Sequence, residues 1–113
     1  MALDNLTAQV KRKLNITWED ADTDARVAEI MADVTPYLLH RLGITDAAFD
    51  FSAPGMECDL FKACCLYEWN HVPRDEFEQN YRRTLAYVRD RHTVAYYAAQ
   101  EEMEGETDED EGV

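Results

Sequence analysis

Three cysteines and one histidine are the residues of this sequence best suited to metal binding or thiol chemistry. Cys58 and Cys65 share one face of an expected helix, and Cys64 and His71 share another. A zinc site needs four converging ligands, usually with a closely spaced cysteine pair, and neither face provides them. Cys64 and His71 are two turns apart, beyond hydrogen-bonding reach. We therefore predict no metal, no cofactor and no catalytic residue, and interpret the cysteines as small buried hydrophobes.

Asp20, Asp22 and Asp24 alternate in the manner of a calcium-binding loop. No glycine or bidentate glutamate follows at the offsets that an EF-hand requires. The pattern instead predicts a helix start, with Asp22 or Thr23 as its N-cap and the other acids near the positive end of the helix dipole. A phosphate-cradling glycine loop is also missing, so we do not predict an enzyme.

Lys11, Arg12 and Lys13 form a short basic run at the end of an expected helix. The favoured interpretation is a solvated helix end, where cations suit the dipole. The alternative is a small patch that binds phosphate or an acidic partner.

The stretch from Gly55 to His71 predicts a helix that is apolar nearly all round. One stripe contains Met56, Leu60, Ala63, Cys64 and Tyr67, and the opposite side contains Cys58, Phe61, Cys65 and Trp69. A helix with two apolar sides is a buried helix, and in so short a chain it is the central one. Its second stripe needs a cover, either from the same chain or from a neighbouring subunit.

Apolar residues at helical spacing predict three further helices, and no repeat is evident. They cover Leu3 to Leu14, Thr23 to Leu42 and Arg74 to about Gln100. Pro36 predicts a kink in the second of these, and Gly43 its C-terminal cap. The expected fold is all-α, a small four-helix bundle with a central buried helix over residues 1–100 and a disordered acidic tail over residues 101–113.

The net charge of −13 is concentrated at the C-terminal end. Residues 101–113 hold eight carboxylates and no base, so residues 1–100 carry 16 acidic against 11 basic side chains, a net charge of −5. This balance disfavours general nucleic-acid binding. The sequence contains neither an 18-residue apolar run nor the features of a signal peptide, which predicts an intracellular protein with free thiols and no membrane contact.

The order of these elements, together with two diffuse motifs, resembles a known family. The motifs are Lys-x-x-Leu-x-Ile at Lys11–Ile16 and Phe-Glu-x-Asn-Tyr-Arg at Phe77–Arg82. Between them lie an acidic loop at Trp18–Asp24, a long helix closing at Leu42–Ile44 and the buried helix. Over roughly residues 3 to 95, the chain is similar to the head–tail connector (adaptor) proteins of tailed bacteriophages and prophages.

The resemblance implies a helical connector domain that assembles as a homo-oligomeric ring in the bacterial cytoplasm and ends at the head–tail junction of the virion. The ring would dock under the portal protein, present a platform to the next connector or stopper protein, and extend a channel through which DNA passes without specific binding. The predicted interface candidates are two arginines on the polar face of the last helix and three residues of the second apolar stripe: Arg82, Arg89, Phe61, Cys65 and Trp69.

Two other function classes stay open at this point. A small acidic DNA-mimic inhibitor would need carboxylates spread over a folded face, whereas half as many acids lie in the tail as in the whole fold. A small helical DNA-binding regulator would need basic residues on one exposed face. Only Arg82, Arg83, Arg89 and Arg91 approach this arrangement, and they point in different directions.

Overall fold

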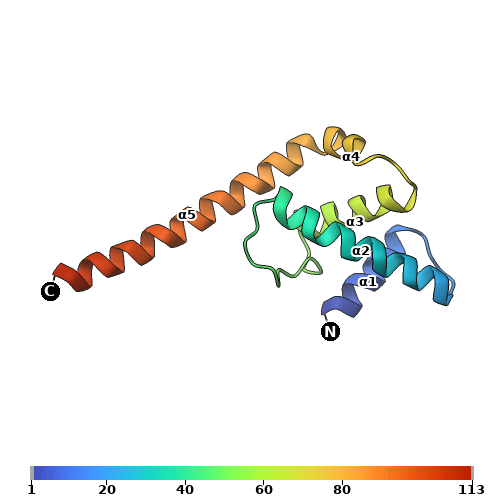
Figure 1. The fold of residues 1–113 in the computed structure, drawn as a ribbon, viewed down its shortest axis with the longest axis horizontal. Coiled ribbons are helices and arrows are strands. Elements are labelled where there is room, and N and C mark those ends of the chain that lie inside the picture. The colour runs from blue at the N-terminus through green and yellow to red at the C-terminus, as the bar shows by residue number, and fades with distance from the viewer. Residues whose placement is uncertain (1, 113) are drawn as a thin grey trace.

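The computed structural model describes the backbone of residues 2–112 and the side chains of residues 5–102 (Figure 1). In that range the chain forms five helices and no strand, which confirms the predicted all-α class. The helices are α1 (Ala2–Lys13), α2 (Ala21–Arg41), α3 (Met56–Trp69), α4 (Arg74–Asn80) and α5 (Arg82–Gly112). The predicted four-helix bundle is therefore replaced by a five-helix arrangement, in which α3 packs against each of the other helices.

The N-cap of α2 lies two residues before the nearer of the two predicted positions. Asp20, not Asp22 or Thr23, is the N-cap, with an extended backbone at φ −157°. Its Oδ2 accepts hydrogen bonds from the backbone N–H of Thr23 at 3.0 Å and from the Thr23 hydroxyl at 2.9 Å. One carboxylate thus satisfies a free helix N–H and fixes the first turn. Across Pro36 the helix continues unbroken to Arg41, as its in-phase apolar stripe predicted.

Three helices end with the same reversal of the chain. Asn15, Gly43 and His71 follow α1, α2 and α3 in left-handed conformation, with φ of 60°, 66° and 58°. In each case the next residue donates its N–H to the carbonyl five residues earlier, at 2.9 Å. This is the Schellman arrangement, for which glycine is the residue without steric cost. The predicted role of Gly43 is confirmed, and Asn15 and His71 take the same role.

The core lies where α1, α2 and α3 meet. The side chains that α2 buries follow its predicted stripe: Val27, Ile30, Met31, Val34 and Leu38. On α3 both stripes contribute, with Cys58, Leu60, Phe61, Ala63, Cys64 and Cys65 all buried. The second stripe is therefore covered by this chain itself, including Phe51, whose ring centroid lies 4.9 Å from that of Phe61.

The last predicted helix is two helices. The break falls at Tyr81, where the backbone leaves helical geometry at φ −109° and ψ 16°. There the Tyr81 ring stacks on Phe77, with centroids 5.0 Å apart, and meets the edge of Tyr67 at 6.0 Å. The bend lets Phe77 on α4 and Leu85 on α5 both reach the core, where each is fully buried.

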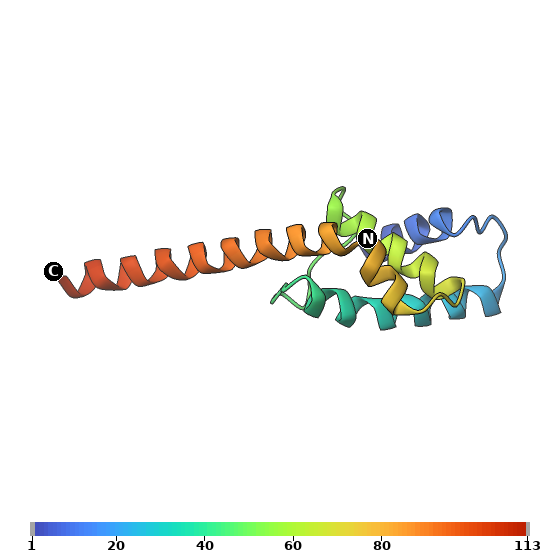
Figure 2. The ribbon, with the colours of Figure 1, turned by 90° about the horizontal axis from the view of Figure 1, so that it is seen from above.

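Helix α5 leaves the body and projects beyond it (Figure 2). The chain measures 64 × 32 × 19 Å, and its radius of gyration is 17.6 Å, against roughly 13 Å for a compact domain of this length. The backbone of α5 continues to Gly112, past the helix end predicted near Gln100, and the disorder expected over residues 101–113 stays a prediction. Glu and Met favour helix and no proline follows Pro73. The side chains of residues 103–113 lie outside the described part.

Candidate interaction surface

The cysteines are placed for packing and not for reaction. All three are buried free thiols. Burial raises the pKa of the Cys64 thiol to about 12 and also raises the pKa of Cys65, so both stay protonated and are poor nucleophiles or metal ligands. Cys58 donates its S–H to Gln9 Oε1 at 3.0 Å. Among the described residues, no group of three His, Cys, Asp or Glu side chains is placed to hold a metal ion.

Two of the interface candidates from the second stripe of α3 are inaccessible. Phe61 and Cys65 have no exposed surface, and Phe51 of the α2–α3 loop packs against Phe61. Trp69 is half-buried under the Arg26 guanidinium, whose central carbon lies 4.2 Å from the ring centroid. The same guanidinium donates to the Trp69 carbonyl at 2.7 Å. The prediction that a neighbouring subunit contacts Phe61 and Cys65 is therefore corrected.

The two arginine candidates have different environments. Arg89 Nη1 donates to the carbonyls of His40 at 3.2 Å and Arg41 at 3.0 Å, the last carbonyls of α2. It therefore joins α5 to the negative end of the α2 dipole. Arg82 is exposed and makes no ion pair within the described residues. Glu78, which lies four residues before Arg82 and would be within its reach along a continuous helix, instead accepts hydrogen bonds from Tyr37 and Arg41 of α2.

A half-buried carboxylate anchors the first half of α5 to the body. Glu57, in the first turn of α3, has a side chain only 13% exposed. Its Oε2 lies 3.0 Å from Arg91 Nη2 and 2.8 Å from His92 Nε2. Burial acts to raise the Glu57 pKa, but hydrogen bonds from its own backbone N–H and His92, with the Arg91 charge, hold it below the ordinary 4.5. The anchor is thus strongest when Glu57 is ionised.

Acid should weaken this anchor and the Glu78 contacts together. The Glu78 pKa is also lowered, chiefly by the Tyr37 hydroxyl and then by Arg41. Since each folded-state pKa lies below the unfolded value of 4.5, the stabilisation is complete above that value and is lost as the pH falls through the folded-state pKa. We expect the urea concentration at the unfolding midpoint to decrease as the pH is lowered from about 5 to about 3.

The matched variants for this pH prediction are Glu57→Gln and Glu29→Gln. Glu57→Gln should lower stability at neutral pH and flatten the acid dependence, because the lost charge is the one that acid removes. Glu29 is exposed on α2 and makes no ion pair within the described residues, so Glu29→Gln should leave the profile unchanged. Equal pH profiles for Glu57→Gln and the parent chain would contradict the role given to Glu57.

The side of α5 away from the body carries exposed apolar side chains that sequence reasoning missed. Tyr87, Val94 and Tyr97 are 54%, 69% and 62% exposed. They lie seven and three residues apart and so share one face of the helix; we call them the α5 strip. The helical spacing of these three residues is visible in the sequence. It was overlooked because their sequence neighbours Leu85 and Val88 form the stripe that faces the core.

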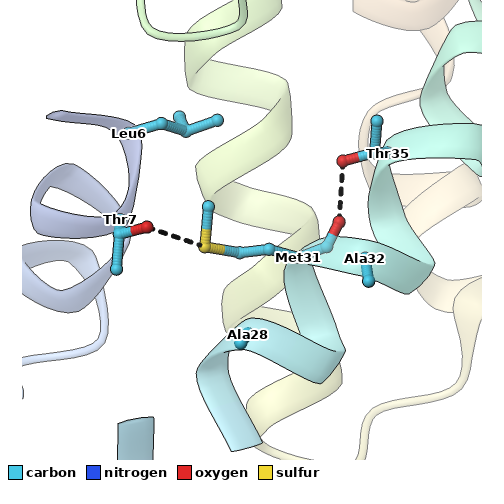
Figure 3. A pocket seen from close by; sticks show the side chains of 6 residues that line it. All are labelled: Leu6, Thr7, Ala28, Met31, Ala32 and Thr35. Atoms are coloured by element: carbon cyan, nitrogen blue, oxygen red, sulfur yellow. Dashed lines mark hydrogen bonds between the residues drawn. The ribbon is translucent and has the colours of Figure 1, made fainter. Parts of the chain in front are cut away.

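A shallow apolar groove lies between α1 and α2 (Figure 3). It has a volume of about 280 Å³ and is lined by Leu6, Thr7, Ala28, Met31, Ala32 and Thr35; we call it the α1–α2 groove. Leu6 and Met31 are buried and form its floor, while Ala28 and Ala32 are exposed. Met31 Sδ accepts a hydrogen bond from the Thr7 hydroxyl at 3.7 Å, and its carbonyl accepts one from Thr35 at 2.7 Å.

Comparisons of the chain with protein-family models, with curated proteins and with solved structures find no match. Within residues 2–112, no helix combines the length and the apolarity needed to cross a membrane. The arrangement of the described residues is that of a small helical body with protonated, buried thiols and one projecting helix that exposes Tyr87, Val94 and Tyr97 on its outer side. Such a surface is suited to contact with another protein.

Proposed function

We propose that this protein is a structural virion protein, a head–tail connector that forms a ring under the portal of a tailed bacteriophage or prophage. The observation that carries the proposal is the projection of α5, with Tyr87, Val94 and Tyr97 exposed on a helix that its own body leaves uncovered. Exposed apolar patches on a helix usually mark a protein–protein contact. A ring provides such a contact for every copy.

The charge of the chain suits the conduit that the proposed ring would form. Residues 1–100 carry a net charge of −5. A negative channel wall repels phosphates, so DNA would pass without specific binding. A regulator that reads DNA with α5 is less well supported, because Arg89 and Arg91, two of its four arginines, are engaged with α2 and with Glu57.

Native mass measurement, of the chain alone and with the portal protein of the same phage, tests the proposal. We expect a single closed oligomer of fixed subunit number on the portal. This expectation holds whether the chain alone is a monomer or an oligomer. Arg82→Ala should leave the melting temperature unchanged and weaken portal binding if Arg82 is a contact, because its side chain is exposed and makes no ion pair within the described residues.

Arg89→Ala is the informative comparison for Arg82→Ala. It should lower the melting temperature, because the last carbonyls of α2 lose their donor. A chain that stays monomeric and never binds the portal would rule out the connector function.

A further inference from the structure

We propose that the α5 strip of one copy docks in the α1–α2 groove of a second copy. The inference rests on the ring of the proposed function and identifies the two surfaces that meet in it. Tyr97 and Val94 would enter the groove against Leu6 and Met31.

The α5 strip needs a cover that its own chain does not supply. Isolated helices are marginal in water, and most helical stability in proteins comes from packing of an apolar face. The body covers Val88 on the inner side of α5, whereas Val94 and Tyr97 stay more than half exposed. Figures 1 and 2 show α5 running away from α1, so the strip does not reach the groove of its own chain.

The α1–α2 groove has the size and chemistry of a side-chain acceptor. Its volume of about 280 Å³ lies just below the roughly 300–1,000 Å³ of small-molecule pockets. Two exposed alanines, Ala28 and Ala32, let another helix approach closely. Met31 on the floor is an adaptable side chain that makes favourable contacts with aromatic rings, which suits Tyr97.

Charge complementarity between the end of α1 and the end of the α5 strip favours another copy of this chain as the occupant and sets its direction. The last turn of α1 continues from the groove with Arg12 and Lys13, both exposed. The α5 strip is followed by Glu101 and Glu102, also exposed, and the sequence adds six further carboxylates after them. With the C-terminal end of α5 directed at the basic turn, Glu101 and Glu102 would meet Arg12 and Lys13, and not the exposed acids Glu29 and Asp33 beside the groove on α2.

The contact is heterologous, because strip and groove are different surfaces of the chain. Head-to-tail repetition of such a contact closes into a ring when the rotation permits. Three side chains cover far less than the roughly 800 Å² per partner of a standard interface. A single contact is therefore expected to be weak. In a ring closed on the portal, every copy would make two such contacts and also contact the portal, and these contacts together would stabilise the assembly.

Cysteine cross-linking between two differently labelled chains tests the contact directly. One chain carries Tyr97→Cys and the other Ala32→Cys, and the two are mixed, with and without the portal protein, and oxidised. We expect a disulfide-linked pair that contains one chain of each kind. Asp33→Cys replaces Ala32→Cys in the control, because Asp33 is the next residue of α2, exposed, but outside the groove. Equal cross-linking with Asp33→Cys would overturn the proposal.

Filling the groove tests the same contact without cross-linking. Ala28→Arg should fold normally, because Ala28 is exposed, and should weaken self-association about tenfold or more. Ala48→Arg adds the same charge at an exposed position of the α2–α3 loop and should have no effect. If rings form on the portal but Ala28→Arg assembles like the parent chain, the docking is wrong and the connector function stands. If no assembly forms with any chain, both fall.

Discussion

Replacing Phe77 by alanine is expected to lower the free energy of unfolding by about 3–5 kcal/mol, the range of large-to-small changes at buried aromatic positions. Phe77 is fully buried and is the buried residue of α4. Its ring stacks on Tyr81 at 5.0 Å and meets Tyr67 at 5.5 Å and Tyr37 at 6.5 Å. The truncation leaves a cavity among three aromatic rings, each of which loses a favourable contact. Urea unfolding of the isolated chain measures the loss.

Tyr97→Ala is the control for Phe77→Ala, since it removes an aromatic ring of similar size from an exposed site. Tyr97 is 62% exposed, so its removal should change stability by less than about 0.5 kcal/mol in the isolated chain. A Phe77→Ala variant as stable as Tyr97→Ala would show that α4 is not held by its aromatic cluster. The same pair also separates folding from docking, because only Tyr97 belongs to the α5 strip.

Apolar periodicity predicted most of the fold because burial in a helical protein repeats with the helix itself. Val27, Val34 and Leu38 lie one or two turns apart in the sequence and are all fully buried on one side of α2. Gly43 was predictable as a helix terminator for a local reason, since its left-handed backbone is strained in other residues. The matching positions of Asn15 and His71 were not predicted, because neither residue type requires that conformation.

The break at Tyr81 was hidden by the same periodicity. Phe77, Tyr81, Leu85 and Val88 stay in phase for one continuous helix, which is what the sequence predicted. The cause of the break is tertiary: Tyr81 packs between Phe77 and Tyr67, a residue fourteen positions earlier. Apolar spacing along one helix does not show which residue of another helix packs against it. A bend caused by the contact with Tyr67 was therefore not predictable from the spacing.

The candidate site was mispredicted where partners from other helices compete with near neighbours in the sequence. Helical spacing favoured a Glu78–Arg82 pair, but Tyr37 and Arg41 of α2 take the carboxylate of Glu78. Arg89 was predicted as an interface candidate on the polar face of the last helix, and its guanidinium bonds the end of α2. The rule for ion pairs at i,i+4 considers only residues of the same helix, so it does not include donors or acceptors on α2.

Phe61→Ala is expected to cost about 3–5 kcal/mol of unfolding free energy in the isolated chain, with no partner present. Phe61 has no exposed surface and its ring lies 4.9 Å from that of Phe51, so truncation opens a cavity between α3 and the α2–α3 loop. Should the alanine variant not fold, Phe61→Leu provides a smaller change at the same site.

Trp69→Ala distinguishes a core role from an interface role on the same stripe of α3. Trp69 is half-buried, and its ring lies beneath the Arg26 guanidinium, so the loss should be smaller, about 1–2 kcal/mol from partial burial and the cation–π contact. An interface role for Phe61 would give the opposite order: unchanged unfolding for Phe61→Ala alone, with assembly on the portal lost. The full burial of Phe61 predicts instead that Phe61→Ala loses assembly only to the extent that it loses folded protein. Measuring unfolding and assembly on the same preparations decides between the core role and the interface role.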